Sequence, residues 1–212
     1  MVSRTIELVC FDLGGVLVEC VDGWTEACAR AGISSSALLE DPTRRDEMIE
    51  ASCRFETGEF ATEQFVDALG RCINYDRDQV RAVLEAWLID LYPGVAELLE
   101  QLRGRGVATA CLTNCNAIHW EQLRDPNSRF AALGTLDHHF ASHLTAARKP
   151  DPLAFENVEQ CLRVPAECIL FFDDREENIA GAVWQHWQTQ LINPDQDPVH
   201  QLDKYLKRHN VL

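Results

Sequence analysis

The stretch "IELVCFDLGGVL", residues 6–17, joins a short apolar run to a carboxylate and two glycines. A continuous apolar run of this length is typical of a strand that is buried on both faces of a parallel sheet. The run ends at Asp12, so the expected strand delivers an acid to a loop. Gly14 and Gly15 let that loop bend freely and leave its backbone N–H groups open to an anion.

Similar apolar runs recur along the chain. They are "VATACL" (107–112), "CILFF" (168–172) and "TQLI" (189–192), with "HHFAS" (138–142) as a weaker candidate. Apolar residues at helical spacing lie between them, from Val95 to Leu102 after Pro93, and from Leu153 to Leu162. Alternating strands and helices predict an α/β fold, in which a parallel sheet carries helices on both sides and binds ligands beyond the carboxyl ends of its strands.

The region from about residue 22 to residue 90 breaks this alternation. Apolar residues repeat at helical spacing from Phe65 to Ile73 and again from Val80 to Leu88, and no good strand candidate lies here. Asp76 with Gln79 resembles a capping box at the start of the second helix. We therefore expect a small helical lobe over residues 21–90, inserted into a sheet domain formed by residues 1–20 and 91–212.

Composition narrows the classes of function. The 212 residues carry a formal net charge of −15 with scattered basic residues, which argues against nucleic acid as a partner. No apolar stretch approaches the roughly 20 residues that cross a bilayer, and the run after Arg4 is interrupted by Asp12, unlike a signal peptide. The nine cysteines lack paired or zinc-binding spacing. We expect a cytoplasmic protein that binds neither nucleic acid nor membrane.

Polar residues follow three of the other expected strands. These are Thr113 and Asn114 after 107–112, Lys149 after 138–142, and Asp173 and Asp174 after 168–172. Because the carboxyl ends of parallel strands share one edge of the sheet, the topology brings these residues beside Asp12. Each residue alone also has an ordinary explanation as a turn, a helix cap or a solvated surface residue. Their order and common position favour a joint site.

The residue types in this site predict a chemistry. Several carboxylates in one crevice repel one another unless a hard cation is present, and carboxylate and carbonyl oxygens suit Mg²⁺. Lys149 can hold a phosphoryl oxygen, and Thr113 with the backbone N–H groups of Leu13 and Gly14 can donate to the others. Asp12 would then be the nucleophile and form a phosphoaspartate that water hydrolyses.

With these motifs in order, the sequence resembles the haloacid dehalogenase-like hydrolase superfamily. "FDLGGVL" looks like its first motif, "LTN" its second, "RKPDP" its third and "FFDDREEN" its fourth, while "ETGEF" (56–60) and "LYPGV" (91–95) resemble segments of capped members. The sequences of the second and fourth motifs are similar to those in the phosphatase domain of soluble epoxide hydrolases and in bacterial sugar-phosphate phosphatases. The resemblance implies a Rossmann-like core, a helical cap over the inserted lobe, and a Mg²⁺-dependent phosphatase that acts on a small phosphorylated metabolite.

The resemblance also assigns roles by motif position. Asp174 is expected to ligate Mg²⁺ together with Asp12 and the carbonyl of Gly14, and Asp173 to do so directly or through water. Asn114 is expected to orient the nucleophile or to contact the ligand. The catalytic set is then Asp12, Thr113 and Lys149. The oligomeric state and the identity of the substrate stay open.

Gly14 departs from the family pattern. Phosphatases of this family usually carry a second Asp there, which protonates the leaving oxygen and then activates water, a role worth about 10²–10⁴-fold. Gly14 cannot move a proton, so either the substrate has a good leaving group, or another acid acts (Glu19 and Asp22 are nearest in sequence), or turnover is slow or absent. We favour a selective phosphatase. The alternatives are a 2-haloacid dehalogenase and a non-catalytic protein that binds a phosphorylated ligand.

Overall fold

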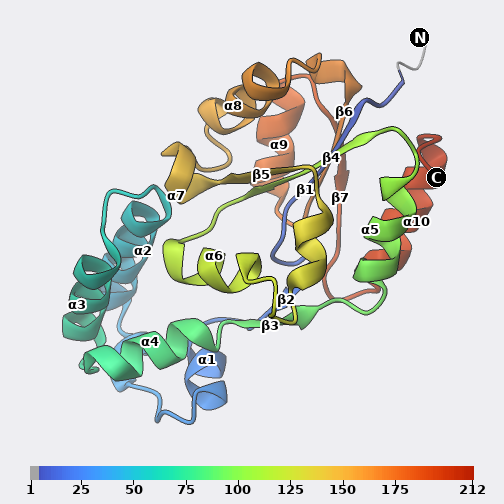
Figure 1. Ribbon diagram of the computed structural model, residues 1–212. Helices are drawn as coiled ribbons and strands as arrows, with labels where there is room; N and C mark the ends of the chain where they lie inside the picture. The colour runs from blue at the N-terminus through green and yellow to red at the C-terminus, as the bar shows by residue number, and fades with distance from the viewer. Residues whose placement is uncertain (1–4) are drawn as a thin grey trace.

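Five parallel strands form the central sheet, in the order β5–β4–β1–β6–β7 (Figure 1). Their bounds are β1 Leu8–Phe11, β4 Ala108–Thr113, β5 His138–Ala141, β6 Ile169–Asp173 and β7 Gln188–Leu191. All five strands expected from the apolar runs are confirmed, with ends within two residues of those expected. This computed structural model describes residues 5–212, so Arg4 and the rest of the first four residues lie outside it.

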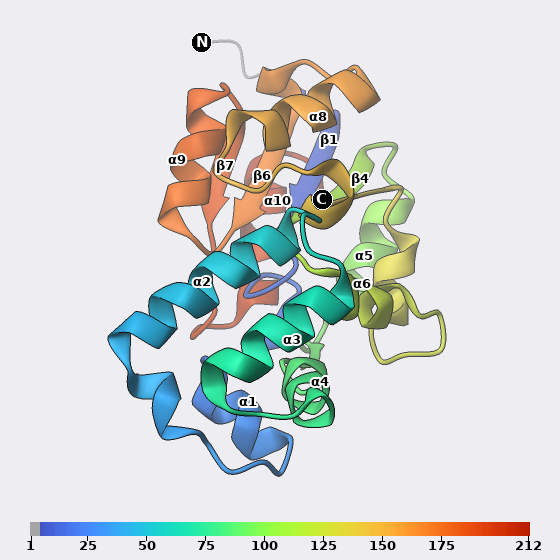
Figure 2. The ribbon, with the colours of Figure 1, turned by 90° about the vertical axis from the view of Figure 1, so that its left-hand side faces the viewer.

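Helices cover both faces of the sheet (Figures 1 and 2). On one face, Val9 and Phe11 of β1 pack in a cluster with α5 (Val95–Arg103) and α10 (Pro198–Arg208). On the other face, Leu8 and Cys10 pack in a cluster with α8 (Pro152–Leu162) and α9 (Glu176–Trp184). Both clusters take side chains from β1, which explains why its apolar run shows no polar alternation.

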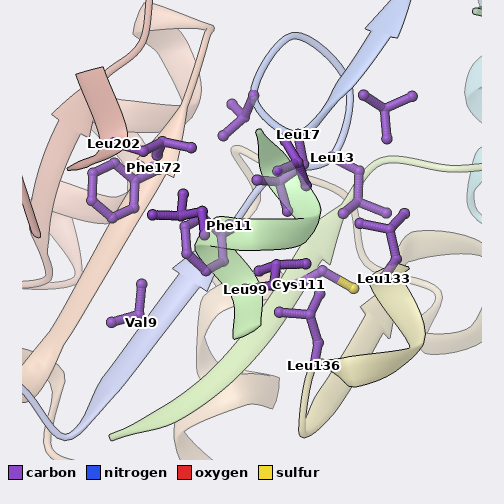
Figure 3. Close-up of a cluster of buried hydrophobic side chains, with 14 of the residues drawn as sticks. Val9, Phe11, Leu13, Leu17, Leu99, Cys111, Leu133, Leu136, Phe172 and Leu202 are labelled. Carbon is purple, nitrogen blue, oxygen red and sulfur yellow. The ribbon is translucent and has the colours of Figure 1, made fainter. Parts of the chain in front are cut away.

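The packing directly beneath the end of β1 involves two aromatic rings. Phe11 pairs in register with Phe172 of β6, and their rings stack with centroids 5.5 Å apart. Figure 3 shows Phe11 within the cluster that also holds Val9, Leu99 and Phe172. One residue later the backbone N–H of Asp12 donates to the carbonyl of Phe172 at 2.8 Å. This buried packing fixes the ends of β1 and β6 relative to each other.

Four helices lie between the first strand and the rest of the sheet domain, and they have a hydrophobic core of their own. They are α1 (Trp24–Arg30), α2 (Pro42–Glu56), α3 (Thr62–Ile73) and α4 (Arg77–Glu85). The capping box of Asp76 and Gln79 at the start of α4 is confirmed. The remaining elements are α6 (Ala117–Arg124), the single-turn α7 (Ser142–Thr145), and the 3₁₀ turns η1 (Ala37–Glu40), η2 (Ala131–Thr135) and η3 (Ala166–Cys168).

A two-stranded antiparallel ribbon connects the helical segment to the sheet domain, and here one expectation was wrong. β2 (Val18–Cys20) pairs with β3 (Leu88–Leu91), although no strand was expected between about residues 22 and 90 and the second helix was expected to reach Leu88. The helix ends at Glu85 because the chain must turn to pair with β2, and Trp87 accepts a hydrogen bond from the N–H of Val21 instead. Residues 21–90 stay our proposed bounds for the cap.

The α6 helix contacts the inserted helices through a partly buried histidine. His119 Nε2 donates to the carbonyl of Leu84 in α4 at 2.9 Å, while its Nδ1 accepts from Asn116 at 3.1 Å. Both hydrogen bonds suit the neutral ring, and burial lowers the pKa of His119 to about 4.

None of the helices within residues 5–212 has the length and apolar character needed to cross a membrane.

We predict that His119 makes the folded protein less stable in mild acid. The unfolded chain binds this proton near pH 6.5 and the folded protein only near pH 4, so the stability is complete above about pH 6.5 and falls as the pH drops toward 4. The loss from this one group is at most about 3 kcal/mol. Urea unfolding of the wild type and His119→Gln at several pH values should give stability curves that converge as the pH falls; parallel curves would contradict this.

Candidate active site

Three charged side chains meet at the carboxyl ends of the strands. The Nζ of Lys149 lies 3.1 Å from Oδ1 of Asp12, which follows β1, and 2.6 Å from Oδ2 of Asp173, which ends β6. The side chains of Lys149 and Asp173 are fully buried, and that of Asp12 is 11% exposed. An ammonium can be buried in this way because two carboxylates contact it directly.

Asp173 is held by further donors. Asn178, buried in the first turn of α9, donates through Nδ2 to both oxygens of Asp173 at 3.0 and 3.1 Å. The backbone N–H of Arg175 adds a third contact at 2.9 Å. Asn178 was not among the predicted site residues. Its signal in the sequence is its position five residues after Asp173, which places it on the inner face of the following helix.

Asp174 completes a cluster of three carboxylates. Asp12, Asp173 and Asp174 each bring one carboxylate oxygen within 4.8 Å of the others. The chain can approach this cluster because Gly15 adopts a left-handed backbone conformation, with φ of 71°. A Cβ atom at Gly15 would overlap the carboxylate of Asp174. The second glycine of the Gly14–Gly15 pair is therefore required by the geometry of the site.

The carboxylates together carry more negative charge than Lys149 offsets. Burial, together with the neighbouring acids Asp173 and Asp174, raises the pKa of Asp12 to about 7, although Lys149 opposes this shift. Burial and Asp173 also raise the pKa of Asp174. Conversely, Asp12 and Asp173 outweigh burial and raise the pKa of Lys149, which stays charged. A divalent cation with oxygen ligands fits this donor set and this excess of negative charge.

The remaining predicted residues lie around this cluster. Thr113 is buried at the end of β4, and the N–H of Leu13 donates to Oδ1 of Asp12 at 2.7 Å. Asn114 bonds the main chain of Lys149 on both sides: its Nδ2 donates to the Lys149 carbonyl at 2.9 Å, and its Oδ1 accepts from the Lys149 N–H at 2.8 Å. The amide of Asn114 thus holds the segment that carries the buried ammonium.

The space beside Gly14 is occupied by a thiol. The φ angle of Gly14 is not positive, and a Cβ atom there would lie 3.4 Å from the Sγ of Cys20. Glu19 and Asp22, the acids nearest in sequence, are both exposed. Burial raises the pKa of Cys20 to about 12, with Asp12 and Asp174 adding to the effect, so the thiol stays protonated and is a weak proton donor.

Residues 6–184 match the family model for a haloacid dehalogenase-like hydrolase. The chain belongs to the haloacid dehalogenase-like hydrolases. The match spans all six predicted polar residues of the site and the inserted helices; these residues are Asp12, Thr113, Asn114, Lys149, Asp173 and Asp174. The superfamily resemblance of the four motifs and the Rossmann-like α/β fold are thereby confirmed.

Individual relatives of this hydrolase differ in their named activities. A sesquiterpene phosphatase of Aspergillus oryzae is 29% identical over 182 residues, which cover 84% of this chain and 85% of the relative. Haloacetate dehalogenase H-2 of a Moraxella species is 25% identical over 200 residues, covering 90% and 87%. A family enzyme of Bacteroides thetaiotaomicron, solved with magnesium and inorganic phosphate, has a TM-score of 0.77 at 22% identity and covers 92% of this chain and 98% of its own.

We predict that the two adjacent glycines of this hydrolase respond differently to alanine. Gly15→Ala should lower the free energy of unfolding by at least about 1–2 kcal/mol, because its left-handed backbone disfavours a Cβ atom that would also displace Asp174. Gly14→Ala is the matched control and should be neutral or stabilising by about 0.4–1 kcal/mol. Denaturant unfolding measures both variants, and equal losses would show that the approach of Gly15 to Asp174 is not a constraint.

Proposed function

We propose that this hydrolase is a Mg²⁺-dependent phosphatase that cleaves a small phosphate monoester through a phosphoaspartate on Asp12. The observation that carries the proposal is the buried cluster of Lys149 with Asp12, Asp173 and Asp174 at one edge of the sheet. The cluster combines a nucleophilic carboxylate, a cation for a phosphoryl oxygen and an excess of oxygen ligands. These are the parts that phosphoryl transfer to a carboxylate needs.

The three carboxylates have different contacts, and we assign them different roles on that basis. Asp173 already accepts from Lys149, Asn178 and the Arg175 N–H, so we assign it mainly to holding the ammonium. Asp12 and Asp174, with the carbonyl of Gly14, are left as the direct ligands of Mg²⁺. When bound, Mg²⁺ would neutralise charge on the phosphoryl oxygens and on the acids around it. The Bacteroides enzyme, which was solved with magnesium and inorganic phosphate, supports the choice of Mg²⁺ as the cation.

The proposed reaction has two displacements at phosphorus. In the first, an oxygen of Asp12 bonds to phosphorus while the bond to the ester oxygen breaks, and the alcohol portion leaves with the electron pair. In the second, water attacks the phosphoaspartate, which releases inorganic phosphate and restores the Asp12 carboxylate. Lys149, the hydroxyl of Thr113 and the N–H of Gly14 are the proposed donors to the phosphoryl oxygens in both steps.

The glycine at position 14 restricts the proposed substrates. Without a carboxyl group at this position, no acid of the loop protonates the leaving oxygen, and Cys20 is too weak an acid to replace it. Substrates whose oxygen leaves without a proton, such as anomeric or acyl phosphates, fit this site best. A sesquiterpenyl phosphate belongs in any substrate panel because of the Aspergillus relative.

The dehalogenase alternative shares the Asp nucleophile but needs no metal, and a relative with that activity exists. The acidic pair Asp173–Asp174 argues against it, since an acid cluster that binds no cation would repel a carboxylate substrate. Release of halide from haloacids without Mg²⁺ would favour the dehalogenase. Tight phosphate binding without turnover would favour the non-catalytic protein.

We predict that Asp12→Asn abolishes turnover. Across a panel of sugar 1-phosphates, acyl phosphates, alkyl phosphates and a sesquiterpenyl phosphate, the wild type should release phosphate with Mg²⁺ and lose this activity in excess EDTA. The variant should lose at least about 10³-fold in kcat, because an amide oxygen cannot form the covalent intermediate. Wild-type-like turnover by a folded Asp12→Asn variant would exclude Asp12 as the nucleophile.

We also predict that Gly14→Asp broadens the substrate range. The backbone of Gly14 tolerates a side chain, and a carboxyl group there restores a proton donor for poor leaving groups. Hydrolysis of alkyl phosphates should rise, with about 10²–10⁴-fold as the ceiling, while acyl phosphates change little. Because Cys20 lies against the new side chain, Gly14→Asp with Cys20→Ala is the companion variant. No gain for alkyl phosphates in either variant would show that proton transfer is not the missing element.

A further inference from the structure

An ion pair joins the cap to the sheet domain beside the site. Nη2 of Arg148 lies 2.9 Å from Oε2 of Glu56, the last residue of α2, and the two side chains are 33% and 24% exposed. Within residues 5–212, this is the only ion pair that connects the segment 21–90 with the rest of the chain. Because both side chains are partly buried, removing either partner leaves the other charge without its counter-ion in a partly desolvated position.

Two further contacts seat the same end of α2 on the sheet domain. Nη1 of Arg148 donates to the Sγ of Cys53, one turn before Glu56, at 3.3 Å. Gly58 has a φ of 75°, and a Cβ atom there would lie only 2.5 Å from the carbonyl oxygen of His143 in α7. The turn that follows α2 therefore lies directly against α7, as both ribbon views show (Figures 1 and 2).

This contact reaches the catalytic lysine through the main chain. Arg148 immediately precedes Lys149, whose N–H and carbonyl are both bonded by Asn114. The cap thus holds one side of the segment that carries Lys149, while the loop after β4 holds the other. The carboxylate of Glu56 also interacts electrostatically with Arg175, the residue that follows Asp174.

We propose that Glu56 is a positioning residue of the hydrolase: through Arg148 it seats the cap on the segment that carries Lys149 and so aims the lysine Nζ at Asp12. The proposal rests on the phosphatase function given above. Glu56 touches none of the reacting atoms. When the pair is broken, the cap and the Lys149 segment lose their common anchor, and a displacement of about 1 Å at a catalytic group can cost about 100-fold in rate.

The kinetic test uses Glu56→Gln, Arg148→Gln and the double variant, with Arg54→Gln as the matched control. Arg54 lies on the same turn of α2, but its pair with Glu59 is exposed and stays within the cap. Glu56→Gln and Arg148→Gln should each lower kcat roughly 10- to 100-fold at a temperature where the proteins are folded, and the control should not. The double variant should lose no more than the worse single variant, because both remove one interaction. Multiplicative losses, or a lower unfolding midpoint with unchanged kcat, would overturn the proposal.

A second readout does not depend on turnover. Hydrogen exchange followed by mass spectrometry should show faster exchange over residues 142–149 in Glu56→Gln and Arg148→Gln, but not in Arg54→Gln. If the wild type hydrolyses no ester of the panel, the phosphatase function fails, and the exchange data alone decide whether the cap anchors this segment. If the wild type is active and Glu56→Gln keeps both its kcat and its exchange protection, the positioning role is overturned while the function stands.

Discussion

The burial of one ammonium group between two carboxylates governs this structure. Lys149 is fully buried, and a buried charge costs several kcal/mol unless its partners are close and correctly placed. β1 and β6 must therefore be neighbours that end at the same level, so that Asp12 and Asp173 both reach the Nζ atom. The stacking of Phe11 on Phe172 sets that level within the apolar core. Two hydrogen bonds between the side-chain amide of Asn114 and the main chain of Lys149 then hold the segment that carries this lysine.

The same charges determine what the site can do. Asp173 is saturated by donors, whereas Asp12 has a pKa raised to about 7 by burial and by its acidic neighbours. A cation that lowers this pKa would return Asp12 to its nucleophilic, ionised form. Proton delivery is the element that this loop lacks, since Gly14 lies beside a weakly acidic thiol, and Glu19 and Asp22 are exposed to solvent. The proposed site therefore suits transfer of a phosphoryl group from a substrate with a good leaving group.

The strands and the gathering of acids were predictable because both depend on local patterns. Continuous apolar runs ending in Asp12 or Asp173 identify buried parallel strands and their carboxyl ends without any long-range information. β3 was missed because Leu88 continues the helical spacing of α4, and only its pairing with β2 ends the helix. The Glu56–Arg148 pair was not foreseen: both residues begin motifs noted in the sequence, "ETGEF" and "RKPDP", but the motifs are far apart in the chain and do not show that the two side chains meet. Asn178 was predictable only in part. Its spacing from Asp173 can be read from the sequence, but its hydrogen bonds to that carboxylate cannot.

The proposed chemistry requires a divalent cation between Asp12 and Asp174 and a phosphoryl group on Asp12. A crystal structure with Mn²⁺ in place of Mg²⁺, and with beryllium fluoride as a phosphoryl mimic, tests both together. We predict an anomalous difference peak between the Asp12 and Asp174 carboxylates, with beryllium fluoride attached to Asp12 and contacting the Nζ of Lys149. An anomalous peak elsewhere, or a beryllium fluoride that leaves Asp12 unmodified, would contradict the proposed chemistry.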